Sequence, residues 1–330
     1  MKSHTRTASR GELRPRSIIN LALLLAAAFS LASCATVSRH YMDNVETKYP
    51  TVRRFAESTP PAAGVKMKEI RDSEIPGPAG TIEVRFYVPQ TQKENSPVLF
   101  YIHGGGFVSG SINAADSLVR RLSRDLQAPA ISIHYRLAPE HPWPAAIEDC
   151  RAAYAWAEEN AATVFPGSNG KLIIAGESAG ANLAAGITHW KKEEGGEQPV
   201  AQLLYAPYVG NPEPELGALW PSRLEHSKTS VITPRSIDFF TRAYTAGREE
   251  LLAEPSIYPV LYPSFDGLAP AFVTICGRDT LRDESEAYAK LLERDGVFVV
   301  KMFIADRDHA WSGDPVVRAS ADFIHGLPQE

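Results

Sequence analysis

The sequence predicts an α/β fold with a mostly parallel central sheet, helices on both of its faces and a small helical cap. Short, continuous runs of apolar residues recur along the chain, as is typical of strands that are buried on both faces. Segments with apolar residues at helical spacing lie between these runs, and strands that alternate with helices indicate a parallel sheet. The chain has 330 residues, 44% hydrophobic and 22% charged, which excludes disordered, collagen-like and coiled-coil proteins.

The strands are expected in the following order. Residues 82–88 alternate between polar and apolar side chains, which predicts a half-exposed strand. The continuous apolar runs predict buried strands at 98–102, 131–135, 172–175, 202–205, 271–275 and 297–303. Because these strands are parallel, their carboxyl ends lie along one edge of the sheet.

Three helices are expected between the strands. One follows Pro144, one follows Gly180, and one spans residues 283–294 and ends before Gly296. Residues 208–256 break the alternation and are rich in proline and aromatic side chains. We expect them to form a cap that is inserted between two strands and covers the carboxyl edge of the sheet.

The N-terminus has the composition of an export signal. Residues 1–33 begin with five basic side chains and one acidic one, and they continue into an apolar run at 18–29 that is short for a membrane span. The run ends in Leu31-Ala32-Ser33-Cys34, which resembles a bacterial lipobox, in which the cysteine becomes the new N-terminus and carries lipid. The alternative is an ordinary signal peptide with an incidental Cys34.

The lipobox predicts an exported bacterial lipoprotein whose lipid on Cys34 holds it on a membrane surface. By analogy with Gram-negative lipoproteins, Ala35 favours the outer membrane where the bacterium has one. After Cys34 we find no apolar run long enough to cross a bilayer.

Charge and composition narrow the partners. The net charge is −5 and the basic residues form no stripe, so nucleic acid is not an expected partner. Three cysteines are too few for a disulfide-built fold, and Cys150 and Cys276 are expected to be buried as small apolar side chains. We expect no metal and no cofactor, because no set of His, Cys and carboxylate residues has ligand spacing.

The segment around Ser178 predicts a nucleophile on a sharp turn. The strand at 172–175 leads into Gly176-Glu177-Ser178-Ala179-Gly180, and residues 181–185 favour a helix. Glycine on both flanks permits a turn that holds the serine in a strained, exposed position. The backbone N–H of Ala179, at the start of the helix, then serves as an oxyanion donor. The alternative is a plain glycine-rich turn.

A second glycine-rich segment, His103-Gly104-Gly105-Gly106-Phe107, follows the strand at 98–102. Its backbone N–H groups can approach a ligand without obstruction by side chains, as an oxyanion hole requires. A loop without a binding role is the alternative. His103 precedes the nucleophile in the chain and is expected to make structural hydrogen bonds.

Three histidines late in the chain are candidates for the general base. His226 lies in the expected cap and His325 at the end of the last helix, whereas His309 follows the last strand and suits the role. Asp279 follows the strand at 271–275 and is expected to orient His309. Asp283 and Glu284 are expected to favour the dipole of the next helix, and Asp306 and Asp308 to be solvated loop carboxylates.

Together these motifs resemble those of the hormone-sensitive-lipase-like (type IV) family of α/β-hydrolase esterases. The resemblance covers about residues 80–325 and rests on the segments 103–107, 135–140 and 141–146, the turn at Ser178 and the segments of Asp279 and His309. It implies a catalytic triad formed by Ser178, His309 and Asp279. It also implies an oxyanion hole formed by the backbone N–H groups of Gly105, Gly106 and Ala179.

The resemblance also implies a division of the chain. Residues 34–65 are expected to be a tether and the N-terminal part of the cap, and residues 66–330 the catalytic domain with the insertion at about 208–256. Glu177 stands where the family usually has Asp or Thr, Thr280 where it has Pro, and Ala310-Trp311 where it often has Gly-Phe. Phe107 and Trp311 are expected to line the substrate pocket.

The sequence thus predicts a serine carboxylic-ester hydrolase that acts on small esters with short to medium acyl chains through an acyl-enzyme. Two other enzymes with the same triad stay open, a deacetylase of acetylated carbohydrate and an amidase. A non-catalytic surface binding module is the alternative from a different class. The sequence does not indicate an oligomeric state.

Overall fold

The computed structural model describes residues 49–51, 53–54, 58, 64–210 and 220–328. The expected signal peptide, Cys34 and most of the expected tether lie outside these residues. The described strands are β1 Met67–Gly77, β2 Gly80–Pro89, β3 Ser96–Ile102, β4 Ala130–His134, β5 Ser168–Glu177, β6 Ala201–Tyr205, β7 Ala271–Cys276 and β8 Val299–Ile304.

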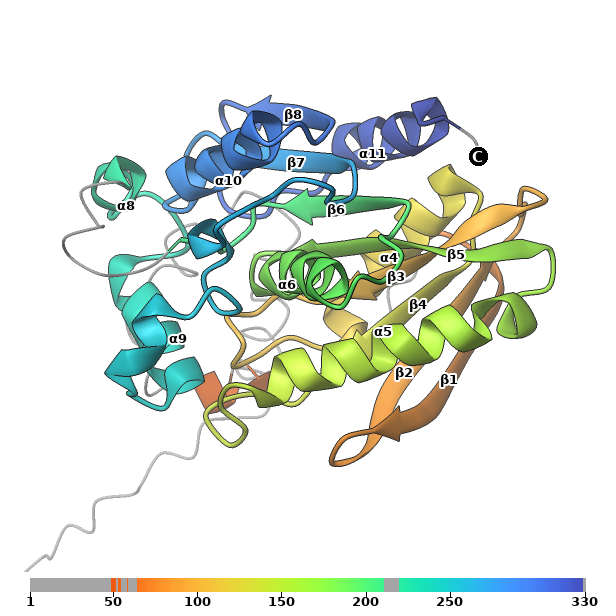
Figure 1. Ribbon diagram of the computed structural model, residues 1–330, viewed down its shortest axis with the longest axis horizontal. Helices are drawn as coiled ribbons and strands as arrows, with labels where there is room; N and C mark the ends of the chain where they lie inside the picture. The colour runs from red at the N-terminus through yellow and green to blue at the C-terminus, as the bar shows by residue number, and fades with distance from the viewer. Residues whose placement is uncertain (1–48, 52, 55–57, 59–63, 211–219, 329–330) are drawn as a thin grey trace, which may run out of the picture.

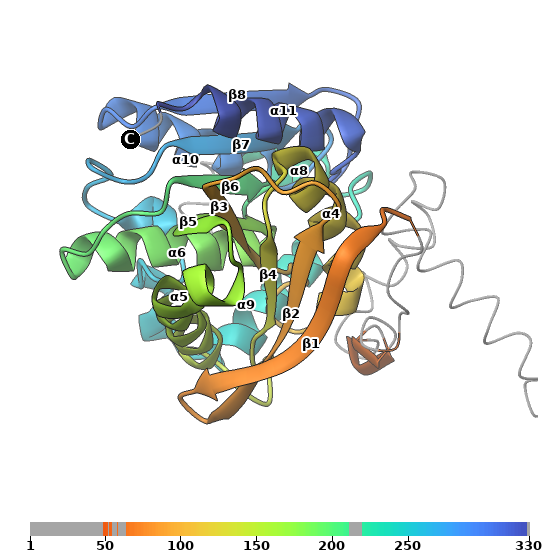
Figure 2. The same cartoon turned by 90° about the vertical axis from the view of Figure 1, so that its right-hand side faces the viewer.

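These strands form one sheet in the order β1-β2-β4-β3-β5-β6-β7-β8. The six strands β4, β3, β5, β6, β7 and β8 are parallel to one another, whereas β2 is antiparallel to both β1 and β4. Figure 2 shows the β1–β2 hairpin at one edge of the twisted sheet and β8 at the other. The expected mostly parallel sheet is therefore confirmed.

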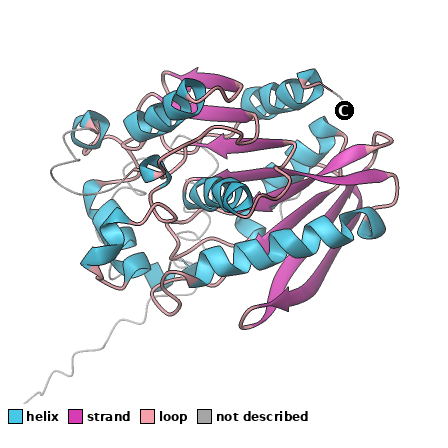
Figure 3. Cartoon of the chain, in the orientation of Figure 1, coloured by secondary structure: helices cyan, strands magenta, loops and turns pink. Residues whose placement is uncertain are grey.

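The helices cover both faces of the sheet (Figures 1 and 3). The described helices are α4 Ile112–Leu126, α5 Ala145–Val164, α6 Ala179–Glu193, α8 Pro221–Glu225, α9 Pro234–Thr245, α10 Arg282–Arg294 and α11 Asp314–Gly326, with short 3₁₀ helices η1 Glu249–Ala253 and η2 Pro259–Leu261. Helices α4 and α11 pack on one face, and α5, α6 and α10 pack on the other. None of the described helices combines the length and apolar composition needed to cross a bilayer.

Alternation along the strands divides the core into two layers. In β3, Val98, Phe100 and Ile102 face the layer of α5 and α6, whereas Leu99 and Tyr101 face the layer of α4 and α11. All five side chains are fully buried. A strand with two buried faces needs apolar residues at every position, which is why these strands appear in the sequence as unbroken apolar runs.

Between β6 and β7, helices α8 and α9 and the 3₁₀ helix η1 lie at the end of the sheet to which the arrowheads of β6 and β8 point (Figure 1). They belong to the stretch expected to form a cap. A capping box begins α9: Thr233 Oγ1 accepts from Ser236 N, and Ser236 Oγ accepts from Thr233 N.

An N-terminal segment also reaches this region. The Arg53 guanidinium donates to the carbonyls of Val108 and Ala138 and to the Glu140 carboxylate. The ring of Tyr49 lies 5.4 Å from that of Phe239 in α9. These contacts hold the start of the described chain against the segment that follows the glycine loop.

Candidate active site

Ser178 lies on a tight turn between a strand and a helix. Strand β5 ends one residue before it, and helix α6 begins with Ala179 directly after it. Its backbone has φ 53° and ψ −120°, a conformation that residues other than glycine rarely adopt. A Cβ atom at Gly180 would lie 2.2 Å from the carbonyl oxygen of Ile102, so only glycine fits there. The hydrogen bond from Ser178 N to Tyr205 O, at 2.9 Å, anchors the turn to β6.

The glycine loop at residues 103–107 lies beside this serine. A Cβ atom built on Gly104 would be 3.4 Å from the Cβ of Ser178. Gly105 has a φ of +121°, and a Cβ there would lie 2.2 Å from the Ser109 carbonyl oxygen. The glycine therefore permits the path by which the backbone of this loop comes close to Ser178, and a side chain at this position would change that path.

His103 stabilises this loop, as expected. Its Nδ1 lies 2.8 Å from the Gly104 carbonyl oxygen, and its Nε2 lies 3.1 Å from Nδ1 of His134. Burial, together with the neighbouring His134, lowers the pKa of His103 to about 3, so the ring is neutral at physiological pH. Its ring also stacks on Tyr135, whose hydroxyl donates to the His103 carbonyl.

Asp279 and His309 meet at the carboxyl edge of the sheet. Asp279 follows β7 and His309 follows β8, and His309 Nδ1 lies 2.7 Å from Asp279 Oδ2. Both side chains are largely buried, with exposed fractions of 8% for His309 and 1% for Asp279. The other oxygen of Asp279 accepts from Leu281 N at 2.9 Å, which fixes the carboxylate in the turn before α10.

Carboxylates set the charge state of His309. Burial by itself would lower the pKa of the ring, but Asp279, Asp308 and Glu177 together raise it above the ordinary 6.5. Burial raises the pKa of Glu177, while the charge of His309, a backbone hydrogen bond from Gly104 and the charge of Arg121 act in the opposite direction. Glu177 therefore links the glycine loop electrostatically to His309.

Asp308 corrects one expectation. It is not a solvated loop carboxylate, because its Oδ1 accepts from Ser230 Oγ and from His309 N, each at 2.7 Å, and its Oδ2 accepts from Val231 N at 2.8 Å. Asp306, by contrast, has an 85% exposed side chain that pairs with Arg278. No local pattern in the sequence reveals this role of Asp308, because its partners in the cap lie 77 and 78 residues earlier in the chain.

The glycine loop also packs against the cap helix α9. A Cβ atom at Gly106 would lie 2.6 Å from the ring of Phe240. The ring of Phe107 is 1% exposed and stacks on that of Tyr244, with centroids 3.9 Å apart. Phe107, expected to line the pocket, is thus placed between the loop and α9.

The remaining candidates lie in other surroundings. Trp311 packs partly buried against the layer of α4 and α11, and the Arg307 guanidinium lies 4.7 Å from its ring centroid. His226 contacts Arg282 and Glu225, and His325 Nε2 lies 3.3 Å from the carbonyl of Leu126.

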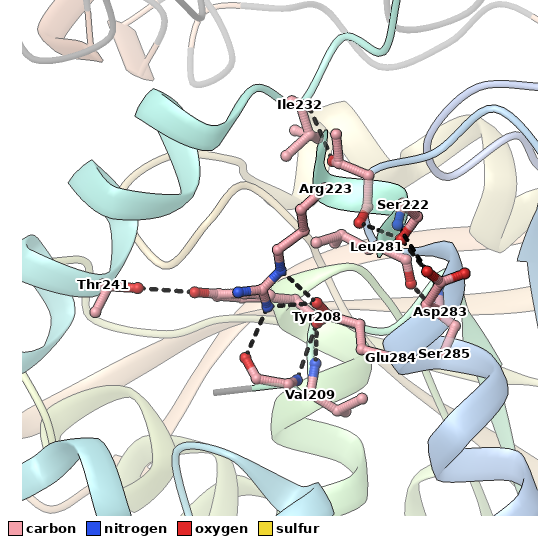
Figure 4. A network of polar contacts seen from close by, with 12 residues as sticks. Tyr208, Val209, Ser222, Arg223, Ile232, Thr241, Leu281, Asp283, Glu284 and Ser285 are labelled. Carbon is pink, nitrogen blue, oxygen red and sulfur yellow. Dashed lines mark hydrogen bonds and ion pairs between the residues drawn. The ribbon is translucent and has the colours of Figure 1, made fainter. Parts of the chain in front are cut away.

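A buried ion pair ties the cap to the helix that follows Asp279 (Figure 4). Arg223 of α8 pairs with Glu284 of α10, with Arg223 Nε 3.1 Å from Glu284 Oε2. The other oxygen of Glu284 accepts from Val209 N and Gly210 N, where the chain leaves β6. Glu284 was expected only to favour the helix dipole; its partners are distant in sequence, so no local pattern revealed this second role.

A second set of bonds in Figure 4 reaches the residue next to Asp279. Ser222 Oγ donates to the Thr280 carbonyl at 2.9 Å, and Thr280 Oγ1 donates to the Ile232 carbonyl at 2.9 Å. Both side chains are fully buried. The loop of Asp279 is therefore held by residues of the cap.

The cysteine side chains of the described residues lie in the core. Cys150 and Cys276 are free and buried, as expected. Burial raises the pKa of Cys276 to about 12 and that of Cys150 well above its ordinary value. Within the described ranges, no three His, Cys, Asp or Glu side chains are grouped so that they could hold a metal ion.

Known proteins resemble the chain in sequence and in structure. It is 38% identical over 248 residues to a carboxylic ester hydrolase, LipN, of Mycobacterium tuberculosis, a match that covers 74% of this chain and 64% of the relative. Esterase LipI of the same organism is 38% identical over 234 residues, 68% of this chain and 69% of the relative.

Among solved structures, ester-hydrolase EH1AB1 from the metagenome of Lake Arreo superposes with a TM-score of 0.77 and 29% identity, covering 95% of this chain and 98% of the other. The family model described as alpha/beta hydrolase fold matches residues 99–312, which include the glycine loop, Ser178, Asp279 and His309. The chain belongs to the α/β-hydrolase fold family.

Proposed function

We propose that the protein is a serine carboxylic-ester hydrolase in which Ser178, His309 and Asp279 form the catalytic triad. One observation carries the proposal: a strained serine beside a glycine loop shares the carboxyl edge of the sheet with a hydrogen-bonded His–Asp pair. The relatives named carboxylic ester hydrolase and esterase support the same reaction class.

The mechanism follows from these groups. Nε2 of His309 takes the proton of Ser178 Oγ as that oxygen attacks the ester carbonyl, and Nδ1–H of His309 donates to Asp279 throughout. The backbone N–H groups of Gly105, Gly106 and Ala179 stabilise the oxyanion. His309 then protonates the leaving alcohol, which leaves an acyl-serine. Water, deprotonated by His309, hydrolyses this ester and restores Ser178.

The acyl group would lie against apolar side chains. Phe240 and Tyr244 of α9 pack against Gly106 and Phe107 of the glycine loop, so aromatic side chains lie next to the proposed oxyanion hole. Apolar walls with a few directed polar groups suit a short to medium acyl chain. The predicted pocket residues Phe107 and Trp311 remain part of this proposal.

The place of action is also a proposal. A lipid on Cys34 would hold the enzyme on a bacterial membrane surface, the outer membrane where there is one. The sequence that supports this is the lipobox-like Leu31-Ala32-Ser33-Cys34 behind a basic and then apolar segment.

Hydrolysis of p-nitrophenyl acetate, butyrate, decanoate and palmitate tests the proposed reaction. We expect turnover of the shorter esters, and Ser178→Ala should lower kcat by at least about 10⁴-fold. Ser73→Ala, on the edge strand β1, is the matched control and should keep full activity. Activity that survives Ser178→Ala would identify another nucleophile. A folded protein that hydrolyses only acetylated sugars would be a deacetylase, and one that hydrolyses only amides would be an amidase. A folded protein that hydrolyses none of these substrates, and whose Ser178 is not labelled by a serine-reactive probe, would be a binding module.

A further inference from the structure

The carboxylate of Asp308 connects two parts of the molecule that are far apart in sequence. It accepts a hydrogen bond from the backbone N–H of His309, the next residue, and two bonds from the cap, donated by Ser230 Oγ and Val231 N. Each of these donors lies 2.7 to 2.8 Å from a carboxylate oxygen. The side chain therefore holds the loop of His309 against the segment between α8 and α9.

The cap side of this contact is itself well fixed. Ser230 is fully buried, and its hydroxyl oxygen accepts from Ile232 N at 3.2 Å while it donates to Asp308. Two residues after Ser230, the carbonyl oxygen of Ile232 accepts a hydrogen bond from Thr280 Oγ1. Thr280 is the residue next to Asp279. Residues 230–232 thus bind the loop of the proposed base and the loop of the proposed acid at once.

We propose that Asp308 is a positioning residue for the ester hydrolysis proposed above, and that it couples the orientation of His309 to cap residues 230–232. Asp308 does not touch the substrate. It fixes the backbone from which the imidazole extends, and with it the position from which Nε2 would take the proton of Ser178 while Nδ1 stays on Asp279. Displacing such a ring by about 1 Å costs up to about 100-fold in rate.

Charge gives the same residue a second effect. The groups that act on His309 are the carboxylates of Asp279 after β7, Asp308 in its own loop and Glu177 at the end of β5, and each raises the pKa of the ring. Removal of one carboxylate lowers that pKa. The base is active when neutral, so a lower pKa moves the acid limb of the pH profile of kcat/KM towards lower pH.

The decisive variant is Asp308→Asn, which keeps the volume of the side chain. It removes the charge and replaces one acceptor oxygen with a donor that faces an N–H or O–H group. We expect kcat on p-nitrophenyl butyrate to fall by about 10- to 100-fold with little change in KM. We also expect the acid limb of kcat/KM to move to lower pH, because one of the carboxylates that raise the pKa of His309 is lost. The shift of this limb reports the lost charge, whereas the fall in kcat at unchanged KM reports the positioning. A residue that only stabilises the fold would lower the melting temperature without lowering the kcat of the folded protein.

Asp306→Asn is the matched control. It removes a carboxylate two residues earlier in the same loop, and that side chain is exposed and pairs only at the surface with Arg278. Its pH profile and kcat should match those of the unmodified enzyme. If Asp308→Asn behaves like Asp306→Asn in an enzyme that requires Ser178, the proposal for Asp308 is wrong while the proposed function stands. An enzyme that does not require Ser178 contradicts the proposed function instead.

A cap variant keeps the test decisive if Asp308→Asn fails to fold. Ser230→Ala removes one donor to Asp308, so kcat should fall by about three- to tenfold with KM unchanged. Combined with Asp308→Asn it should add less than about a twofold loss, because both changes break one contact. Unchanged kcat in Ser230→Ala, or fully additive effects in the double variant, would overturn the coupling between the cap and His309.

Discussion

His309 lies among the carboxylates of Asp279, Asp308 and Glu177, and together they raise the pKa of its ring against the effect of burial. Each carboxylate comes from a different part of the site: Asp279 bonds Nδ1, Asp308 holds the backbone, and Glu177 precedes Ser178 in the tight turn. An imidazolium formed during proton transfer is stabilised by all three charges. The cost is a base that is protonated at mildly acid pH.

This arrangement predicts a pH dependence. The kcat/KM of the unmodified enzyme should fall as the pH drops, with a midpoint above pH 6.5, because the protonated ring cannot accept the proton of Ser178. Glu177→Gln should move this midpoint to lower pH, since it removes a charge that raises the pKa of His309. Initial rates at low substrate concentration across pH 5 to pH 9 measure it. Glu194→Gln, an exposed carboxylate after α6, should leave the midpoint in place.

The individual functional residues differ in how far the sequence predicts them. Ser178 directly follows β5, and Asp279 and His309 lie within a few residues of the ends of β7 and β8, so buried apolar runs locate these proposed triad residues. Asp308 and Glu284 depend on partners more than 60 residues away, and no periodicity encodes such contacts. Phe107 is expected to line the substrate pocket, and in the structure its ring stacks on that of Tyr244 in α9.

At the scale of elements, the short helix α8 is held mainly by its polar contacts with α10. It has only five residues, too few to be stable by itself. The Arg223–Glu284 pair and the bonds of Ser222 to Thr280 and Asp283 supply its attachment. Burial raises the pKa of Glu284, and Arg223 and the backbone N–H groups of Val209 and Gly210 oppose this rise. The positive charge of Arg223 therefore helps the Glu284 carboxylate to remain ionised although it is buried.

Arg223→Met tests this attachment. It leaves Glu284 buried beside a neutral side chain, and breaking a buried ion pair costs about 3–5 kcal/mol of unfolding free energy. Urea unfolding should show this loss. Lys290→Met is the control, because that lysine pairs with Glu286 on the exposed face of the same helix α10 and its loss should cost less than about 1 kcal/mol. Equal stabilities of the two variants would contradict the importance of the Arg223–Glu284 pair.

Most strands were predicted and two elements were not. The buried strands appear as apolar runs, and their observed bounds differ from the expected ones by a few residues. Strand β1 was missed because it is largely polar and pairs only with β2 at the edge of the sheet. Helix α4 was also not predicted, although its apolar residues recur at helical spacing along one face. Side-chain periodicity reports burial, so it detects the core better than the edges.

At the scale of the whole molecule, the sheet gathers the site and the cap at one end. Six parallel strands bring the glycine loop, Ser178, Asp279 and His309 to the same edge, and α8 and α9 lie at that end as well (Figure 1). The opposite edge and the β1–β2 hairpin take no part in the proposed chemistry. Cys34 is not among the residues of the proposed active site, so lipid attachment there should be separable from catalysis.

Cys34→Ala tests this separation. In a bacterial host that lipidates exported proteins it should move the protein from the membrane fraction to the soluble exported fraction, because the proposed lipid on Cys34 would supply the attachment. The kcat of the purified variant on p-nitrophenyl butyrate should equal that of the unmodified protein. Membrane fractionation, together with mass spectrometry of the mature N-terminus, gives the result. An unmodified Cys34 in a protein that still sediments with membranes would contradict the lipobox interpretation.

The contacts of Arg53 and Tyr49 limit how far the active site could lie from a membrane to which Cys34 is anchored. They fix the chain beside the segment that follows the glycine loop, and Tyr49 lies only 15 positions after Cys34. Fully extended, those residues span about 50 Å. A lipid on Cys34 would thus confine the catalytic end of the protein to a layer of about that thickness next to the membrane. Esters dissolved in or bound to that membrane would meet the active site at a raised effective concentration, whereas esters in the surrounding solution would not.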